Sequence, residues 1–322
     1  MRAPWHVGAL LLAACAGEPT SAGPADDLPF DADAPPPVCA DETIGGIIDV
    51  HEHVVGADGL EAMLAATAEV GIDRTVAFSM LPGRFEDSAR LIAKADELPH
   101  RLIPFTTVDV RDPHALGFLK ASVAAGARGL KLFSGHGEVH GETPLDAAAA
   151  GPIYEYLEQT GTPLLMHVNG PEYGGELERV LDAHPDLVMV CPHLCLYAHR
   201  PGRLAALLDA YPNLYVDLSF GKSSAAHMAF MQIGHDIETW RRFVRVYVDR
   251  ITFGSDTVFV SDNTAVRDRE YLRSYLAFVE DETFLYEGRE YAGLGADACT
   301  AKHILEHNPG RFVEGLPPER AP

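Results

Sequence analysis

Short apolar runs and longer amphipathic stretches alternate along the chain from Gly45 onward. The apolar runs predict β-strands at residues 46–50, 74–80, 102–110, 129–133, 163–168, 187–193, 214–219 and 251–256. Between them, residues 59–71, 114–126, 151–161 and 203–213 carry the apolar periodicity of helices, and several of these stretches end in glycine, as helix C-termini prefer. Continuous apolar strands that are covered by crossover helices are typical of a parallel sheet.

This alternation favours a (β/α)₈ barrel, or TIM barrel, as a single catalytic domain over residues 44–322. Eight such units in about 280 residues suit this α/β fold, whose usual size is about 250 residues. A doubly wound open sheet is the alternative, but no glycine-rich phosphate-binding motif follows the first strand. Residues 262–300, which include "YLRSYLAFVEDETF", are predicted as a helix and a loop that decorate the barrel, without a second domain.

The N-terminal residues follow a different pattern. The apolar run from Val7 to Ala14 is too short to span a bilayer, which takes about 20 residues, but it fits a secretory signal. "LAAC" at residues 12–15 resembles the lipobox of bacterial lipoproteins, so residues 1–15 are predicted as a lipoprotein-type signal peptide with cleavage before Cys15. The alternative is an overlong start with a chance Ala/Leu-rich stretch.

Residues 16–43 are rich in Pro, Asp and Ala and are predicted as a disordered tether. We therefore expect an exported bacterial lipoprotein, periplasmic or at the cell surface, that touches the membrane only through its lipid anchor.

Composition narrows the class of partner. Hydrophobic residues make up 47% of the chain and charged residues 22%, which is ordinary for a globular protein with a sizeable core. Asp and Glu number 47 against 25 Lys and Arg, a formal charge of −22 that argues against binding nucleic acid, since phosphates need a basic surface. A small-molecule substrate is expected, and a homo-oligomer is left open.

Five cysteines remain to be placed. With Cys15 lipidated, Cys39 and Cys299 are free to pair in an oxidising compartment, although sequence does not determine connectivity. Cys191 and Cys195 flank "CPHLC", which lacks the C-x₂-C spacing of a zinc site. We expect these two to be partly buried thiols.

Polar residues interrupt the strands at their C-terminal ends. In "IIDVHEHVV", Asp49, His51 and His53 should share one face of an extended chain, with Glu52 on the other. Later strands end in further polar side chains of the same kinds, namely Lys131, His167, His193 and Asp256. Barrel active sites lie at this face, so these side chains should meet.

Burying such groups is costly unless they are paired or bind metal. Taken singly, His167 or His193 is typical of a core histidine whose nitrogens are hydrogen-bonded within the protein. Asp256 alone is typical of the residue that caps the next helix. Taken together, imidazoles and carboxylates are the ligand types of zinc and related first-row ions. The joint pattern therefore predicts a metal site.

Seven motifs together resemble the amidohydrolase superfamily, and within it the amidohydrolase-related group of barrel hydrolases and decarboxylases. They are "DVHEH", "GLKL", "PLLMH", "CPH", "PNLYVDLS", "ITFGSD" and the closing "ILEHNPGRF", and they cover residues 44–313. The resemblance implies that a divalent ion, zinc first, is held by four residues, His51, His53, His167 and Asp256. In single-metal relatives the residue at His193 orients water or substrate. In two-metal relatives it binds the second ion and the residue at Lys131 is carbamylated and bridges both.

The expected chemistry follows from these ligands. Metal lowers the pKa of bound water from about 15.7 towards 7 and polarises a carbonyl. Asp256 can then carry the proton to the leaving group, and His193 can stabilise the developing oxyanion. Lys131 could instead bind a substrate carboxylate as a plain positive charge.

We therefore predict a metal-dependent hydrolase that acts on an amide, lactone or ester carbonyl of a small molecule, with one or two ions. A metal-dependent decarboxylase of a small aromatic or enoic acid is the alternative, and a barrel that only binds a ligand is a third. Export favours the hydrolase.

Other polar residues are weaker candidates. Loops of the same face carry His136, Glu138 and His140 in "SGHGEVHGE", and also Arg84, Asn169 and Tyr197. His303 and His307 are expected to have surface or capping roles. Two positions depart from the family pattern: Thr257-Val258 stands where a proline usually follows, and "HLCLY" lacks a glycine soon after His193.

Overall fold

The computed structural model describes residues 30, 39, 41–80, 85–141, 143–222, 224–261 and 265–319. The predicted signal peptide, Cys15, nearly all of the predicted tether, and Arg84 lie outside these residues. None of the described helices is both long enough and apolar enough to cross a membrane.

The described strands of the main sheet run parallel in the order β8-β7-β6-β5-β4-β3-β2-β1-β9. Each strand up to β8 therefore pairs with its neighbours in sequence, as the βα alternation predicts. The strands are β1 Ile47–Val54, β2 Ile72–Ser79, β3 Leu102–Thr107, β4 Gly129–Gly135, β5 Leu164–Val168, β6 Met189–Cys191, β7 Leu214–Asp217, β8 Ile251–Thr252 and β9 Thr257–Phe259.

β8 and β9 are two halves of the eighth barrel position. β8 pairs with β7, and β9 pairs with β1. Between them, Val50 N donates to Phe253 O over 3.0 Å and Asp256 N donates to His51 O over 2.8 Å. The backbone therefore closes the ring, and the predicted (β/α)₈ barrel is confirmed.

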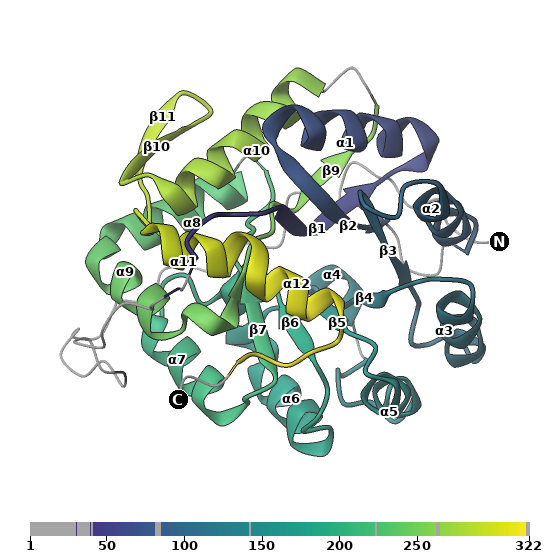
Figure 1. Cartoon of the computed structure of the whole chain (residues 1–322). Coiled ribbons are helices and arrows are strands. Elements are labelled where there is room, and N and C mark those ends of the chain that lie inside the picture. Colours follow the sequence, from purple (N-terminus) through teal and green to yellow (C-terminus); the bar gives the residue numbers. More distant parts are fainter. Residues whose placement is uncertain are drawn as a thin grey trace.

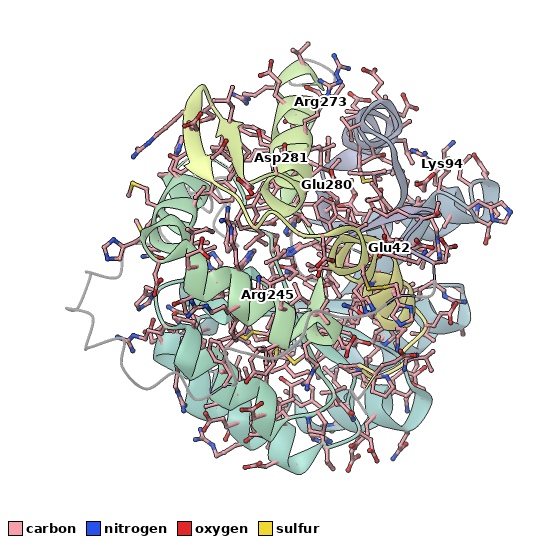
Figure 2. The ribbon with its side chains drawn as sticks, turned by 60° about the vertical axis from the view of Figure 1, so that its left-hand side comes forward. Glu42, Lys94, Arg245, Arg273, Glu280 and Asp281 are labelled. Carbon is pink, nitrogen blue, oxygen red and sulfur yellow. A yellow bond between two sulfur atoms is a disulfide. The ribbon has the colours of Figure 1, made fainter. Side chains whose placement is uncertain are left out.

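Helices surround the strands on the outside (Figure 1). Those that follow the strands are α1 Gly56–Val70, α2 Phe85–Glu97, α3 Ala115–Ala124, α4 Gly137–His140, α5 Gly151–Thr160, α6 Gly170–Ala183, α7 Pro201–Ala210, α8 Ser224–His235, α9 Ile237–Val246 and α10 Ala265–Glu280. The predicted glycine caps are present, with Gly71 and Gly161 left-handed at φ 84° and 63°. Charged side chains project from the outer faces, as Lys94 and Arg273 show (Figure 2).

The chain ends in a segment that plugs one end of the barrel. It consists of α11 Ala298–Lys302, a turn of π-helix at His303–His307, and α12 Asn308–Val313. α12 lies across that end of the barrel (Figure 1). Phe312 packs inside the barrel with Ile48, Phe105 and Tyr215, all buried. Because Ile48 and Phe105 lie near the strand starts or centres, this apolar plug leaves the polar groups to the C-terminal ends.

Residues 281–292 differ from the prediction of a loop. They form an antiparallel hairpin of β10 Thr283–Tyr286 and β11 Arg289–Ala292. Glu287 and Gly288 have φ of 48° and 75°, which is the two-residue hairpin turn whose twist matches that of the strands. Burial alternates along "TFLY", with Phe284 and Tyr286 buried and Leu285 exposed, but the sequence shows three apolar residues in a row and so gave no period-two signal of a strand.

Two disulfides are present among the described residues. Cys39 pairs with Cys299, one of the alternatives left open by the sequence. Cys191 pairs with Cys195, so the prediction of two free thiols there is wrong. The reason is local: the turn after β6 brings the two Cα atoms to 5.3 Å, within the range that a disulfide spans.

Candidate metal centre

A β-bulge lies where the polar residues of β1 begin. Between Asp49 and Glu52, the pairing of β1 with β2 shifts by one residue. A bulge breaks the strict alternation of side chains. His51 and His53 point into the site as predicted, but the prediction that Asp49 joins them and Glu52 faces away from Asp49 is wrong, because the shift brings the two acids together.

Asp49 and Glu52 form a buried pair of carboxyl groups. Burial raises the pKa of Asp49 to about 7 and the pKa of Glu52 well above its usual range, and the neighbouring Asp49 carboxylate raises the pKa of Glu52 further. Ser255 completes the pair, because its N donates to Asp49 Oδ1 over 3.3 Å and its Oγ donates to Glu52 Oε1 over 2.7 Å. These bonds fix the residue before Asp256 against β1.

The two imidazoles of β1 converge on Asp256. His51 Nε2 lies 3.3 Å and His53 Nε2 lies 3.0 Å from Asp256 Oδ1. Two ligands of one tetrahedral zinc ion, each 2.0–2.1 Å from it, lie about 3.3 Å apart. The spacing of these donor atoms therefore fits a shared ion.

Asp217, at the end of β7, orients His51. Its Oδ2 accepts from His51 Nδ1 over 2.9 Å, and both side chains are fully buried. A histidine that donates from Nδ1 to a carboxylate presents the lone pair of Nε2, as a metal ligand must. The motif "PNLYVDLS" contains Asp217, for which no role was predicted, although an acid at the end of an apolar run is the same signal that indicated Asp256.

His193 and His167 lie side by side in the same site. His193 Nδ1 is 2.9 Å from Ser219 O, which can only accept, so His193 Nε2 carries the lone pair in the neutral ring. That Nε2 lies 3.1 Å from His167 Nδ1, which then donates to it. His167 Nε2 is left buried without a hydrogen-bond partner. An orphaned, buried lone pair is what a metal ligand presents before the ion is added.

Lys131 enters the site from β4. Its Nζ lies 3.1 Å from His51 Nε2 and sits over the rings of Phe78 and Phe133 at 5.1 and 5.2 Å. Burial lowers the pKa of Lys131 to about 8. The amine is therefore closer to its neutral form than an exposed lysine, and the neutral amine is the form that carbon dioxide carbamylates.

The pKa values of the site residues favour the binding of a cation. Burial lowers the pKa of His51 to about 3 and also lowers those of His53 and His167. Burial alone would raise the pKa of Asp256, but the facing histidines, His51 first, hold it well below its usual range. At neutral pH the imidazoles are neutral and the carboxylate is ionised, which is the donor set of a divalent ion.

The residues present therefore fit a metal ion. Among the described residues, the donor atoms of His51, His53 and Asp256 gather within 4.8 Å, as do those of His51, His193 and Asp217. His167 belongs to neither group and reaches the centre through its contact with His193. Asp217 already serves His51 as a hydrogen-bond acceptor, so we assign it to orientation.

His193 opens an unusual turn. His193, Leu194, Cys195 and Leu196 have φ of 61°, 53°, 51° and 59°, and none of them is glycine. The left-handed conformation costs an L-residue about 1–2 kcal/mol. Cys191 and Cys195, which enclose His193, are joined by the disulfide described above.

The weaker candidates separate into two groups. His136 lies at the mouth, with its ring 4.9 Å from that of His167. The others have structural contacts. His140 Nε2 lies 2.8 Å from Glu176 Oε2 and ties α4 to α6. Asn169 stands at the N-terminus of α6, where its Nδ2 donates to Glu172 Oε2 over 3.0 Å, and Tyr197 lies on its predicted loop but is buried against α6. The Glu138 side chain lies outside the described residues.

His303 and His307, for which surface or capping roles were expected, are half-buried and contact acidic residues away from the metal centre. His303 Nδ1 lies 3.1 Å from Asp249 Oδ1, and His307 Nε2 lies 3.3 Å from Glu319 Oε2. Both pairs belong to the plugging segment at the other end of the barrel.

A shallow cleft adjoins the centre at the ends of β3 and β4. Its lining is partly apolar, from Val110, Phe133 and Val139, with Arg111 and Asp109 as charged neighbours. Arg111 Nε donates to Asp109 Oδ1 over 2.8 Å. Phe133 connects the cleft to the centre, because its ring lies 5.7 Å from that of His53.

A closed barrel with histidines, a lysine and an aspartate meeting at the carboxyl ends of its strands is the structure of a metal-dependent barrel enzyme of the hydrolase or lyase type. A family model described as amidohydrolase matches residues 30–314. The chain belongs to this amidohydrolase family, as the sequence motifs predicted.

Solved structures are similar in fold. An uncharacterized TIM-barrel protein from Bordetella bronchiseptica is 17% identical, with 84% of this chain and 99% of that chain covered and a TM-score of 0.56. A 4-oxalomesaconate hydratase from Rhodopseudomonas palustris is 18% identical, with 83% and 95% covered and a TM-score of 0.52. At these identities the likeness supports the barrel alone. No match was found among the curated protein sequences compared.

Proposed function

We propose that this protein is a hydrolase that uses metal-activated water on an amide, lactone or ester carbonyl of a small molecule. The observation that carries the proposal is the convergence of His51 Nε2 and His53 Nε2 on Asp256 Oδ1, at 3.3 and 3.0 Å. An ion at that point, zinc first, would supply an acidified water and a polarised carbonyl. His167 and His193 would complete the ligands of one or two ions.

The residues around that point have separable roles. Asp256 is ionised and a fifth of its side chain is exposed, so it can take the proton from the attacking water and deliver it to the leaving group. His193 accepts at Nε2 in its neutral form and would have to gain a proton before it could stabilise an oxyanion. The partly apolar cleft beside Phe133 adjoins the centre, and we propose that the rest of a small substrate extends towards it.

Lys131 supports either of two arrangements. Its lowered pKa and its contact with His51 suit a carbamylated residue that bridges two ions. As a plain ammonium group, it would instead hold a carboxylate of the substrate. The two differ by the mass of carbon dioxide on the lysine.

Elemental analysis of purified protein, grown without chelators, tests the proposal. About two equivalents of metal per chain, with the mass of a carbamate on Lys131, would support the bridged site. About one equivalent would support the single-ion site. A folded protein without metal would contradict the proposal, and a protein that releases carbon dioxide from aromatic acids while ignoring lactones and amides would be the decarboxylase instead.

We also propose that the protein is exported and lipid-anchored, with only its lipid in contact with the membrane. Two disulfides support an oxidising compartment, because cytosolic thiols are kept reduced. The anchor itself rests on the "LAAC" motif at residues 12–15.

A further inference from the structure

The turn from His193 to Leu196 combines a functional residue with a backbone that side chains disfavour. Four consecutive non-glycine residues have positive φ, between 51° and 61°. Glycine would adopt this conformation without steric cost, but the sequence has none here. Something other than local preference must therefore hold the turn.

Backbone hydrogen bonds contribute only part of the restraint. Cys195 N donates to Pro192 O over 3.0 Å and Tyr197 N donates to Leu194 O over 2.9 Å. Bonds of this span are also available to a right-handed turn, so they do not select the left-handed one. A covalent restraint adds to these bonds, since the Cys191–Cys195 bond closes the chain around His193.

We propose that the Cys191–Cys195 disulfide is a positioning element that holds His193 in the metal centre. Cys191 is the last residue of β6 and is therefore fixed by the barrel. Joining it to Cys195, with both side chains fully buried, limits the loop to conformations in which the two Cα atoms stay about 5.3 Å apart. His193, midway between them, takes its direction from that loop.

The effect reaches beyond His193. His193 N donates to Asp217 Oδ1 over 2.8 Å, and the other oxygen of Asp217 holds His51. A turn that relaxed to the right-handed conformation would withdraw this N–H and release one oxygen of Asp217. Both imidazoles would then lose orientation. This inference rests on the proposed function in assigning His193 and His51 to a metal centre.

Three double variants distinguish an effect of the disulfide on the position of His193 from an effect on stability alone. Cys191→Ala/Cys195→Ala removes the disulfide and keeps a Cβ at residue 195. Cys191→Ala/Cys195→Gly removes it but places at residue 195 the amino acid that accepts positive φ. Cys39→Ser/Cys299→Ser removes the other disulfide, which lies outside the metal centre, and serves as the matched control.

Hydrogen exchange of peptides covering residues 190–197 measures the turn without metal or substrate. We expect the alanine pair to lose protection there, the glycine pair to regain most of it, and the control to keep it. Added Co²⁺ is the second probe, through its visible absorption. The alanine pair should bind Co²⁺ about 10- to 100-fold more weakly than wild type, as on loss of a group that orients a ligand, with partial recovery in the glycine pair.

The outcomes distinguish this inference from the proposed function. If wild type binds no Co²⁺, the metal centre is wrong, while exchange still decides whether the disulfide holds the turn. If the alanine and glycine pairs show equal exchange in residues 190–197, and both lose only thermal stability as the control does, the disulfide has no positioning role.

Discussion

At the scale of single residues, Asp217 links the two halves of the metal centre. One of its oxygens accepts from His51 and the other from His193 N, Ser219 N and Ser219 Oγ. Burial alone would raise the pKa of Asp217, but these donors, His51 foremost, keep it below its usual value. A fully buried carboxylate with this many donors stays ionised and rigid, which makes it the residue that sets both imidazoles.

Asp217→Asn should weaken metal binding without unfolding the barrel. An amide accepts on one side only, so His51 loses either its Nδ1 partner or its tautomer. Loss of such a group typically lowers metal affinity about 10- to 100-fold. Competition with a coloured chelator measures it, and Asp249→Asn, at the plugged end, is the control. Equal affinities in wild type and Asp217→Asn would contradict the assigned role.

Asp256→Asn should abolish turnover while leaving the fold intact. The amide cannot take the proton from the attacking water, and general acid–base catalysis contributes about 10²- to 10⁴-fold. Initial rates on a panel of lactones and amides, with circular dichroism as the check of folding, test this. Turnover within a few-fold of wild type would show that another group carries the proton.

Lys131 should make the metal-free protein more stable as pH rises above neutral. Its folded pKa is lowered to about 8, whereas an unfolded lysine titrates near 10.4, so between these values the unfolded chain binds the extra proton. Stability should rise across that window, by up to about 3 kcal/mol. Urea unfolding from pH 7 to 10.5 measures it.

Lys131→Met provides the comparison for that measurement. It removes the titrating group and keeps much of the side-chain volume, so its stability should change less across the same window. If the free energy of unfolding rises equally with pH in wild type and Lys131→Met, the rise comes from groups other than Lys131.

At the scale of elements, the Cys39–Cys299 disulfide ties the segment before β1 to α11. It closes a loop of 260 residues. The same region is held by polar contacts as well, because Gly45 N donates to Glu306 Oε2 over 2.7 Å. The start and the end of the barrel domain are therefore fastened to each other, away from the metal centre.

Cys39→Ser/Cys299→Ser should lower the free energy of unfolding by about 2–5 kcal/mol, because the unfolded chain regains the freedom that the link removes. Thermal and urea unfolding measure the loss. Turnover of the folded enzyme should be unchanged, and a parallel loss of turnover would indicate that the link also acts on the site.

At the scale of the whole molecule, the barrel separates an apolar end from a polar one. α12 fills the end near the strand starts with Phe312, while the C-terminal ends of the strands carry the imidazoles. The metal ligands therefore lie at the end of the barrel that α12 leaves uncovered.

Full-length protein expressed in a bacterium should be found in the membrane fraction. The reason is a lipid on Cys15, so Cys15→Ser should move it to the soluble or uncleaved form. Fractionation with immunodetection measures this. Wild-type protein that is wholly soluble would contradict the anchor.

Much of the metal centre could be predicted from the sequence because the end of each strand can be recognised from a short stretch of neighbouring residues. His51, His53, Lys131, His167, His193 and Asp256 each follow an apolar run, and the parallel barrel brings all such ends to one face. Asp217 also follows an apolar run. No role was predicted for it because "YVDLS" contains no second polar residue of the ligand type, such as a histidine, to mark the acid as part of a site.

What the sequence by itself determined is the barrel, its eight strand positions and the family, because hydrophobic periodicity and short motifs report on local backbone and on burial. Only the tertiary structure decided the bulge that joins Asp49 to Glu52, the tautomers of His51 and His193, and the left-handed turn closed by Cys191 and Cys195. Each of these depends on which groups from distant strands, or from a turn of unusual handedness, come within bonding distance. The order of residues along the chain does not specify these distances, which are set only when the folded barrel brings the groups together.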